Sequence, residues 1–318
     1  MHPVLIKIAV VFALTVTCIY FLKPFSTNSF AIVDTQLSSQ NNSMTEFAVL
    51  TWNVWFGSRG AWDQPKSRWF ELLNIAVSKN PDIVGFQECT ADFIQVAKHH
   101  PEFSKYYEPV NEVPVERYFV MVYKSKNIKK VASETIELKT RLGRKCESVT
   151  VEKSNSLFRF GTVHIESFVT STNIREIQME TIFNALRKKS DGVQLAFLVG
   201  DFNFDETDKE NDFLEKSLFT DTWPVLYKDN KGYSFENQNN LMNKHAMSTA
   251  EGIKTLQQMR LDRIVYWNKS AADNIWIPKK FELLGTKSFD SVTLSDGTKV
   301  PLFPSDHYGL YAEFVKKI

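Results

Sequence analysis

A series of short runs rich in β-branched and aromatic residues recurs from residue 46 to the end of the chain. Runs of this length and composition are typical of β-strands. The predicted strands are Phe47–Trp52, Ile83–Phe86, Tyr118–Tyr123, Lys129–Leu138, Glu147–Val151, Phe158–Val163, Leu195–Val199, Arg260–Tyr266 and Leu310–Phe314. A chain with so many short strands is expected to build its core from packed sheets.

Two longer segments carry a helical pattern instead. In Pro65–Ser78 apolar residues recur on one face, and Asn80-Pro81 ends the pattern. Asn173–Lys189 repeats the spacing and ends in a basic turn, which suits the negative end of a helix dipole. Helices interspersed with many strands predict an α/β fold, a four-layered sandwich of two packed, mostly antiparallel sheets with the helices outside. Asp205–Asn243 shows little pattern and is expected to be loop-rich.

The composition limits the classes of protein to which the chain can belong. Its 318 residues and 43% hydrophobic content allow a sizeable core, in one large domain or two ordinary ones. The 38 basic and 37 acidic side chains nearly cancel, so any contact with nucleic acid is expected to be local. Cys18, Cys89 and Cys146 form neither a disulfide framework nor a zinc motif, although a bridge between the last two remains open.

The N-terminal region differs from the rest of the chain. Val4–Leu22 is apolar apart from Lys7 and two threonines and is long enough to span a bilayer. Residues 1–24 are therefore expected to be a signal peptide or an uncleaved signal anchor, residues 25–45 a polar linker, and residues 46–318 the folded domain. This predicts a membrane-anchored or secreted protein rather than a nuclear one, although a cytosol-facing tail stays open. Sequons at Asn41 and Asn268 are then candidate glycosylation sites.

Polar residues end or follow many of the predicted strands. They are Asn53, Glu88, His164, Asp201 with Asn203, Asp262, and Asp306 with His307. Polar groups that several strand ends bring to one rim are a common way to build an active site on a sheet scaffold. The set is rich in carboxylates and amides, holds two histidines and lacks a nucleophilic serine or cysteine elbow. That chemistry suits a hard divalent cation and a phosphate ester.

Four of these residues suggest a metal site and a water-handling group. Glu88 and Asn53 supply an anionic and a neutral oxygen, the ligand types that Mg²⁺ takes alongside waters and substrate phosphate. Asp201 and Asn203 share a face if the segment is extended, so one could orient or deprotonate water while the other donates to a phosphate oxygen. The alternative explanation is a surface residue for Glu88, and an ordinary polar turn at a strand end for Asn53 and for Asp201 with Asn203.

Asp262 lies in an otherwise apolar run and therefore needs a partner. If the partner is His307, Asp262 fixes the tautomer of the imidazole and raises its basicity. The imidazolium could then stabilise charge that develops on phosphate oxygens. Arg263 is the alternative partner. His164, at another strand end, could donate to the phosphate, and Asp306 could face the metal.

Charged clusters elsewhere are interpreted mainly as solvated surface. The acidic stretch Asp205–Asp212 is expected to be a solvated loop rather than a metal site. The basic clusters Lys124–Lys130 and Arg141–Lys145 could bind a nucleic-acid backbone if they flank the rim. Arg144 is the candidate substrate contact among them.

The ordered set of motifs resembles the endonuclease/exonuclease/phosphatase superfamily, which has the DNase-I-like fold, over about Phe47–Val315. The matching words are Thr51-Trp52-Asn53, Gln87-Glu88, His164-Ile165-Glu166-Ser167, Gly200-Asp201-Phe202-Asn203, Gly232-Tyr233-Ser234-Phe235, Leu261-Asp262-Arg263-Ile264, Leu283-Leu284-Gly285 and Phe303-Pro304-Ser305-Asp306-His307-Tyr308-Gly309-Leu310. Within the superfamily the set is most similar to the tyrosyl-DNA phosphodiesterases.

The resemblance implies a role for each site residue. Glu88 would be the main metal ligand, with Asn53 beside it and Asp306 nearby. Asp201 would activate or position water, while Asn203 and His164 would bind phosphate. His307, oriented by Asp262, would stabilise the transition state. The implied cofactor is Mg²⁺, with Mn²⁺ as a substitute, and the implied reaction is attack of water on a phosphodiester without a covalent enzyme intermediate.

The expected function is therefore a magnesium-dependent phosphodiesterase that acts, as a monomer, on nucleic acid or on a protein-linked nucleotide end. Trp55 departs from the pattern, because the tyrosyl-DNA phosphodiesterases carry an acidic residue there, and the apolar N-terminal segment does not suit a nuclear repair enzyme. The alternatives are a sphingomyelinase-like lipid phosphodiesterase, which tolerates a membrane anchor, and another phosphoester hydrolase of the superfamily. A binding module without turnover is disfavoured, since it would not need the complete set of site residues.

Overall fold

A computed structural model describes residues 46–56, 63–110, 119–188, 192–250, 255–269 and 276–317. The expected targeting segment, residues 1–24, and the whole of the expected linker, residues 25–45, lie outside these ranges. Within the described ranges, no helix combines the length and the apolar character that a membrane crossing requires.

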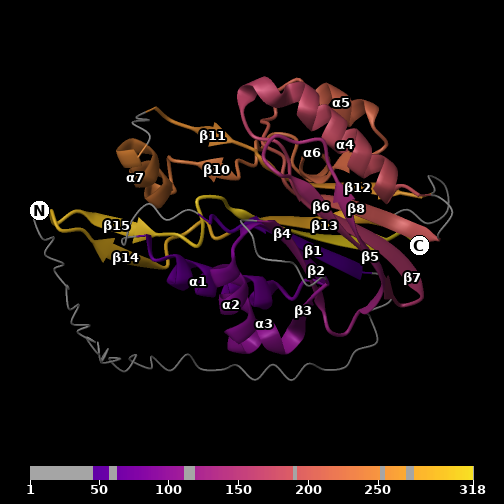
Figure 1. Cartoon of the computed structure of the whole chain (residues 1–318), viewed down its shortest axis with the longest axis horizontal. Coiled ribbons are helices and arrows are strands. Elements are labelled where there is room, and N and C mark those ends of the chain that lie inside the picture. The colour runs from indigo at the N-terminus through magenta and orange to yellow at the C-terminus, as the bar shows by residue number, and fades with distance from the viewer. Residues whose placement is uncertain are drawn as a thin grey trace, which may run out of the picture. The chain divides into compact units, whose positions relative to one another are not determined.

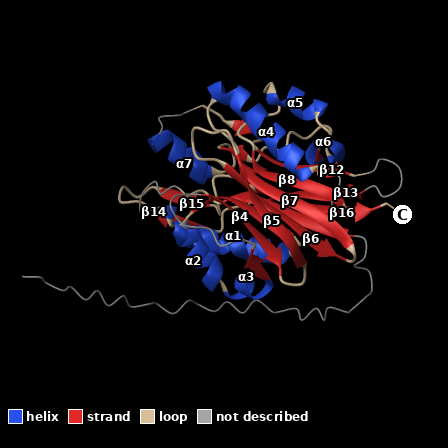
Figure 2. Ribbon diagram, turned by 45° about the vertical axis from the view of Figure 1, so that its right-hand side comes forward, coloured by secondary structure: helices blue, strands red, loops and turns tan. Residues whose placement is uncertain are grey.

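Two six-stranded sheets form the centre of the fold (Figures 1 and 2). The first has the strand order β13-β16-β1-β2-β4-β3, and the second has the order β5-β6-β7-β8-β12-β9. The strands of the first sheet are β1 (Glu46–Asn53), β2 (Ile83–Cys89), β3 (Tyr107–Pro109), β4 (Phe119–Ser125), β13 (Trp276–Leu284) and β16 (Gly309–Lys316). Those of the second are β5 (Lys129–Glu137), β6 (Lys145–Lys153), β7 (Ser156–His164), β8 (Val193–Asp201), β9 (Thr220–Asp221) and β12 (Asp262–Asn268).

Helices cover the outer faces of both sheets, so that the strands lie between two groups of helices (Figure 2). The first group is α1 (Pro65–Lys79), α2 (Ala91–His99) and α3 (Pro101–Tyr106). The second is α4 (Thr172–Leu186), which follows the short 3₁₀ turn η3 (Val169–Ser171), with α5 (Glu210–Lys216) and α6 (Thr222–Leu226). This order of layers confirms the predicted four-layered α/β sandwich.

Apolar side chains fill the space between the layers. Phe47 from the first sheet stacks on Phe158 from the second with ring centroids 4.1 Å apart, which marks the layer between the sheets. Beneath α1, the helical spacing predicted from the sequence buries Trp69 and Leu72 against the first sheet. Ile182 of α4 is buried in the same way on the second sheet. Burial of such side chains contributes about 1.5–3 kcal/mol each, so the layers hold the sandwich together.

The parallel strand pairs determine where the polar strand ends meet. β1 pairs with β2 and β7 pairs with β8 in parallel, while the other pairings described in the two sheets are antiparallel. α1 and α4 connect the two parallel pairs, so both strands of each pair end at the same edge of their sheet. β12 and β16 begin at that edge. In the register, Asp201 pairs with His164 on one side and with Asp262 on the other.

Smaller elements flank this end of the sandwich. They are the hairpin of β10 (Phe235–Glu236) and β11 (Gln258–Met259), the helix α7 (Leu241–Ala250), and the hairpin of β14 (Asp290–Thr293) and β15 (Lys299–Leu302) (Figure 1). Trp55, which follows β1, is buried against Met242 of α7 and Leu302 of β15 in one apolar cluster. This cluster joins the small elements to the end of β1.

The predicted strands and helices are all present, with boundaries that shift by only a few residues. β13 was missed because it is an edge strand in which Pro278 stands beside a register shift, a combination that weakens the strand pattern. The loop-rich interpretation of Asp205–Asn243 was too simple, because α5, β9, α6 and β10 lie there and are too short to show periodicity. Cys89 and Cys146 are free and buried, so no bridge joins them.

Candidate active site

The two sheets are tied together directly beneath the polar strand ends. Gln87 of β2 donates from Nε2 to Thr51 Oγ1 of β1 at 2.9 Å and to Thr162 Oγ1 of β7 at 2.8 Å. All three side chains are buried. A Cβ at Gly85 would lie 2.5 Å from Thr162 Oγ1, so only glycine lets the sheets approach so closely. The sheets are therefore held in fixed relation directly beneath the polar side chains that each supplies to the candidate site.

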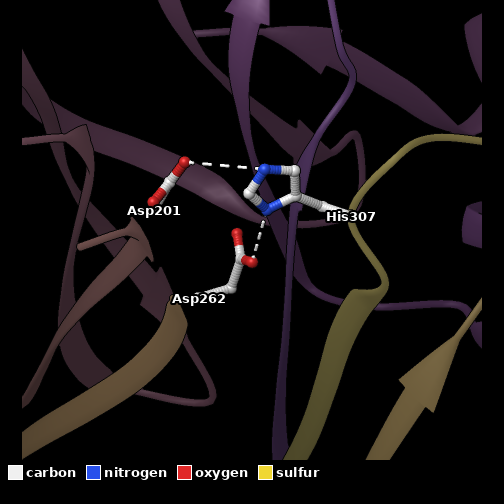
Figure 3. A group of neighbouring side chains, drawn as sticks. All are labelled: Asp201, Asp262 and His307. Atoms are coloured by element: carbon white, nitrogen blue, oxygen red, sulfur yellow. Dashed lines mark hydrogen bonds and ion pairs between the residues drawn. The ribbon is translucent and has the colours of Figure 1, made fainter. Parts of the chain in front are cut away.

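His307 and Asp262 form a buried pair across the two sheets (Figure 3). His307 Nδ1 lies 2.8 Å from Asp262 Oδ2, which confirms the proximity predicted for this pair. Burial acts to lower the pKa of His307, but the facing carboxylates of Asp262 and Asp306 outweigh it and raise that pKa well above its ordinary value. The facing carboxylates thus favour the charged imidazolium. Arg263, the alternative partner, instead contacts Asp221 Oδ2 at 2.6 Å.

Asp201, at the end of β8, faces both histidines. Its Oδ2 lies 3.9 Å from His307 Nε2 and 3.4 Å from His164 Nε2 (Figure 3 shows the first contact). The same oxygen accepts a hydrogen bond from Asn53 Nδ2 at 3.0 Å. The other oxygen, Oδ1, accepts from the backbone N–H of Asn203 at 2.9 Å. These contacts fix the orientation of the carboxylate at the centre of the site.

Asn203 holds this turn in a left-handed conformation, with φ 51°. Its side-chain Nδ2 donates to the Ile165 carbonyl at 3.0 Å. One of its two amide hydrogens is thus used within the turn, and the second is the one that a phosphate oxygen could take. The structure thus shows the polar turn of the alternative explanation, while the catalytic interpretation of Asp201 and Asn203 stays a prediction.

His164 and Arg144 lie on the side of the site built by the second sheet. Burial lowers the pKa of His164 to about 3, and the charges of Arg144 and His307 act in the same direction, so His164 is neutral. Arg144 precedes β6 and is itself buried, and its Nη2 donates to Ser167 Oγ at 2.9 Å. Ser167 is three residues after His164, so the guanidinium lies beside the end of β7. The structure thus places Arg144, the predicted substrate contact, at the rim.

Glu88 lies at an irregular point of β2. The register between β2 and β4 shifts after Phe86, and Glu88 has φ 58°, a conformation that a non-glycine residue adopts at a cost of about 1–3 kcal/mol. Its Oε1 accepts from Asn53 Nδ2 at 3.1 Å and its Oε2 from the Phe56 backbone N–H at 3.1 Å. Burial, together with the charge of Asp306, raises the pKa of Glu88 to about 7. The carboxylate is thus fixed by Asn53 and Phe56, and its Oε1 lies 3.9 Å from His164 Nδ1.

Asp306 follows Ser305 in the loop that leads into β16. Ser305 Oγ donates to the Asn53 carbonyl at 2.6 Å, which fastens this loop to the end of β1. Burial raises the pKa of Asp306, although His307 and Arg68 oppose the rise. Arg68 of α1 is buried with its guanidinium 4.4 Å from the Trp55 ring centre, and its Nη1 donates to the Pro304 carbonyl at 3.2 Å. Arg68 therefore holds the same loop from the side of α1.

Two groupings of acidic residues could hold a divalent cation. Asp201, Asp262 and His307 offer ligand atoms within 4.8 Å of one another. In this grouping the imidazole is engaged by Asp262 and carries a raised pKa, and an imidazolium has no lone pair for a metal. Glu88 and Asp306 are instead two desolvated carboxylates whose pKa values both rise. A divalent cation held by these two carboxylates would offset that cost, so Glu88 and Asp306 fit the metal better.

Asn53 is placed differently from a simple ligand. Its Nδ2 donates to the carboxylates of both Glu88 and Asp201, and its Oδ1 accepts from the Trp55 backbone N–H at 3.1 Å. The amide therefore bridges the two carboxylates with its nitrogen side. Its oxygen already accepts one hydrogen bond and keeps a single lone pair for any further partner.

The structure also corrects two interpretations of charged clusters. The acidic stretch is not simply a solvated loop, because Glu210 is buried and accepts from Arg175 Nε at 2.7 Å, and Asp205 Oδ1 accepts from the Arg260 backbone N–H at 2.8 Å. Within the first basic cluster, Lys124 is buried and paired with Glu108. The roles of Gln87, Ser305 and Arg68 were missed, since each acts through long-range contacts that no local spacing reveals.

Comparisons with known proteins agree with this geometry. The chain matches the Endonuclease/Exonuclease/phosphatase family over residues 50–307. It is 25% identical over 274 residues to the tyrosyl-DNA phosphodiesterase 2 of Gallus gallus, which covers 85% of this chain and 67% of that protein. The crystal structure of D. rerio TDP2 complexed with single-strand DNA product has a TM-score of 0.68 at 20% identity and covers 85% of this chain and 98% of that one. A mannosyl-6-phosphatase of Bacteroides thetaiotaomicron has a TM-score of 0.61 at 17% identity, over 85% and 99% of the two chains.

The family match runs from β1 to the loop before β16 and therefore includes every site residue described above. Its limits enclose Asn53 at one end and His307 at the other. The chain belongs to the Endonuclease/Exonuclease/phosphatase family, and it is accordingly a metal-dependent phosphodiesterase.

Proposed function

We propose that this domain uses Mg²⁺ to hydrolyse a phosphodiester in nucleic acid or at a nucleotide end linked to a protein side chain. The observation that carries the proposal is the cluster of polar groups that the strand ends of both sheets bring together. Asp262 and Asp201 of the second sheet lie 2.8 and 3.9 Å from His307, and Glu88 of the first sheet and Asp306 of the loop before β16 add two desolvated carboxylates. Relatives named tyrosyl-DNA phosphodiesterase 2, and a structural neighbour complexed with single-strand DNA product, support the choice of substrate.

Asp201 is the group placed to orient the attacking water and to take its proton. Both of its oxygens are fixed, by Asn53 on one side and by the Asn203 backbone on the other. A base that is already oriented does not have to reorganise when the proton moves. Mg²⁺ at Glu88 and Asp306 would polarise a phosphate oxygen and neutralise its charge.

His307, as a cation oriented by Asp262, would stabilise the negative charge that builds on the phosphate oxygens. His164 is neutral and can donate one hydrogen bond without adding charge. Arg144 supplies the fixed cation on the same side, and its planar guanidinium suits phosphate or the plane of an aromatic leaving group. The remaining hydrogen of Asn203 would complete the set of donors to phosphate.

A substrate panel tests the proposal. The purified full chain would be assayed on 5′-tyrosyl DNA, single-stranded DNA, sphingomyelin and an aryl phosphodiester, each with Mg²⁺, with Mn²⁺ and with a chelator. Turnover of the nucleic-acid substrates that is lost with the chelator is the expected result. Glu88→Ala and His307→Ala should each abolish it without unfolding the protein. Turnover of sphingomyelin alone would overturn the nucleic-acid proposal in favour of a lipid phosphodiesterase.

We further propose that the domain enters the secretory pathway through Val4–Leu22, as a membrane-anchored or secreted protein. The support is the length and apolar character of that stretch alone. Expression of the full chain in animal cells, followed by protease protection of sealed microsomes, would test it. A domain digested without detergent would lie on the cytosolic side and would contradict the proposal.

A further inference from the structure

A segment outside the catalytic set, residues 234–240, contacts both members of the His307–Asp262 pair. Ser234 Oγ accepts a hydrogen bond from the Asp262 backbone N–H at 2.9 Å. The Ser234 carbonyl accepts from the Tyr308 backbone N–H at 2.7 Å. Phe235 forms an isolated β-bridge with His307, and their ring centroids are 4.9 Å apart. The 234–240 segment therefore touches the backbone of each partner and the face of the imidazole.

Within this segment Glu236 gathers an unusual set of donors. Its carboxylate is buried and accepts from the backbone N–H groups of Gln238 at 2.6 Å, Asn239 at 2.9 Å and Asn240 at 3.0 Å, and from the Tyr308 hydroxyl. All of these donors are neutral. Hydrogen bonds from neutral donors to a buried carboxylate are charge-assisted and stronger than ordinary ones. The Tyr308 hydroxyl is thus held firmly, one residue beyond His307.

The same segment also holds the other side of the catalytic loop. Asn240 donates from Nδ2 to the Ser305 carbonyl at 3.1 Å, and its Oδ1 accepts from the Asn243 backbone N–H at 3.0 Å. Asn243 in turn donates from Nδ2 to the Glu236 carbonyl at 3.0 Å. Ser305 and Tyr308 flank Asp306 and His307. The loop is therefore fixed on both sides by one network centred on Glu236.

We propose that Glu236 is a positioning residue for the phosphodiesterase reaction, which sets the angle of the His307 imidazole toward Asp262 and Asp201 through Tyr308 and Asn240. This inference rests on the proposed role of His307. Glu236 itself is not placed to touch substrate, because the donors described above surround its carboxylate. The carboxylate that His307 Nδ1 contacts is that of Asp262, not that of Glu236. The effect of Glu236 therefore reaches the imidazole through the backbone of the loop that carries His307.

Tyr308→Phe is the sharpest probe, because it removes one hydroxyl and keeps the ring. Turnover of an aryl ester of thymidine 5′-phosphate with Mg²⁺ would give kcat and KM. Loss of a buried charge-assisted hydrogen bond predicts a fall in kcat of roughly tenfold with KM nearly unchanged. Glu236→Gln should lower kcat by at least as much, because its amide would face backbone donors. The matched control is Tyr311→Phe, since Tyr311 also donates to a carboxylate, that of Glu313, and lies in β16 beyond the loop.

A double-mutant cycle separates positioning from a general structural effect. In single turnover with excess enzyme, Tyr308→Phe should slow the parent but leave the rate of an Asp262→Asn background unchanged, because orientation of the imidazole is already lost there. An equal fall in both backgrounds, or a kcat of Tyr308→Phe equal to that of Tyr311→Phe and the parent, would overturn the inference. Full activity in His307→Ala would overturn the proposed function itself, and the two failures are thus distinguishable.

Discussion

Replacing Asp262 with asparagine removes the charge of the carboxylate that faces His307 while keeping its shape. The contact from His307 Nδ1 to Asp262 Oδ2 is 2.8 Å long, and only 1% of the Asp262 side chain is exposed. A hydrogen bond to a charged group contributes about 1.5–3 kcal/mol, and the complete burial of this one favours the upper half of that range. At about 1.4 kcal/mol for each factor of ten, the upper half of that range predicts a fall in kcat of roughly 40- to 140-fold.

A second effect adds to the loss of charge. Asp262 Oδ1 has no hydrogen-bond partner among the described residues. If the asparagine oxygen keeps the contact with His307, its NH₂ group takes the place of Oδ1 and is buried without an acceptor. An unsatisfied buried donor costs about 1–3 kcal/mol, so the variant should also unfold more easily.

The pH dependence follows from the raised pKa of His307. Its folded pKa lies above the ordinary 6.5, so the charged imidazole stabilises the fold fully below pH 6.5, and this stabilisation is lost as the pH rises through the folded pKa. Asp262→Asn lowers that pKa. The stability deficit of the variant should therefore be larger just below pH 6.5 than at alkaline pH, and the basic limb of its kcat profile should move to lower pH.

The assay is steady-state turnover of the aryl phosphodiester across the pH range, with thermal unfolding followed by circular dichroism on the same samples. Asp221→Asn is a suitable comparison, because Asp221 is a partly buried acid in the same sheet that pairs with Arg260 and Arg263 rather than with a site residue. The main effect of Asp221→Asn should be a lower free energy of unfolding, with a smaller effect on the kcat of the folded fraction. A kcat for Asp262→Asn within twofold of the parent, with no shift of the basic limb, would refute the pairing as the source of rate.

Three further predictions concern the metal, the substrate and the surface. Glu88 has to lose its proton to bind a cation, so Mg²⁺ affinity measured by calorimetry should rise as the pH passes about 7, and Glu88→Gln should remove both the binding and its pH dependence. Arg144→Lys should raise KM for a nucleic-acid substrate by roughly tenfold, because a point charge replaces the planar guanidinium, and an unchanged KM would exclude that contact. Asn268 should stay unglycosylated in a secretory host, because its Nδ2 donates to the Trp276 carbonyl at 3.1 Å and its Oδ1 accepts from the Trp276 N–H at 3.0 Å. A glycan found on this peptide by mass spectrometry would contradict the prediction.

The sequence predicted the strands, and the convergence of their polar ends, because local chemistry determines both. The apolar runs that end in Asn53, Glu88, His164 and Asp201 are strands whose ends converge, since parallel pairing places them at one edge. The choice of His307 over Arg263 as the partner of Asp262 could not be made from spacing. Successive residues of a strand point to opposite faces, and the sandwich decides which face meets His307.

The parts that the sequence did not reveal depend on contacts between distant segments. Asn53 has the side chain expected of a metal ligand, yet its amide orientation is set by Glu88, Asp201 and the Trp55 N–H together. Trp55, noted only as a departure from the family pattern, packs in a cluster built from α7 and β15. No short window of sequence contains all the members of such a set.

The bond of Gln87 to Thr51 and Thr162, beneath the site, has a consequence for folding and binding. Each sheet supplies half of the reacting groups, so neither half is active before the sandwich has closed. A ligand that contacts the site residues of both sheets binds only the native state and therefore stabilises it. At a hundredfold excess over its Kd, it adds about 2.7 kcal/mol to the free energy of unfolding. Conversely, a shift of one sheet against the other would abolish activity while the helices and strands are still intact. During unfolding, turnover should therefore be lost before the circular dichroism signal of the secondary structure.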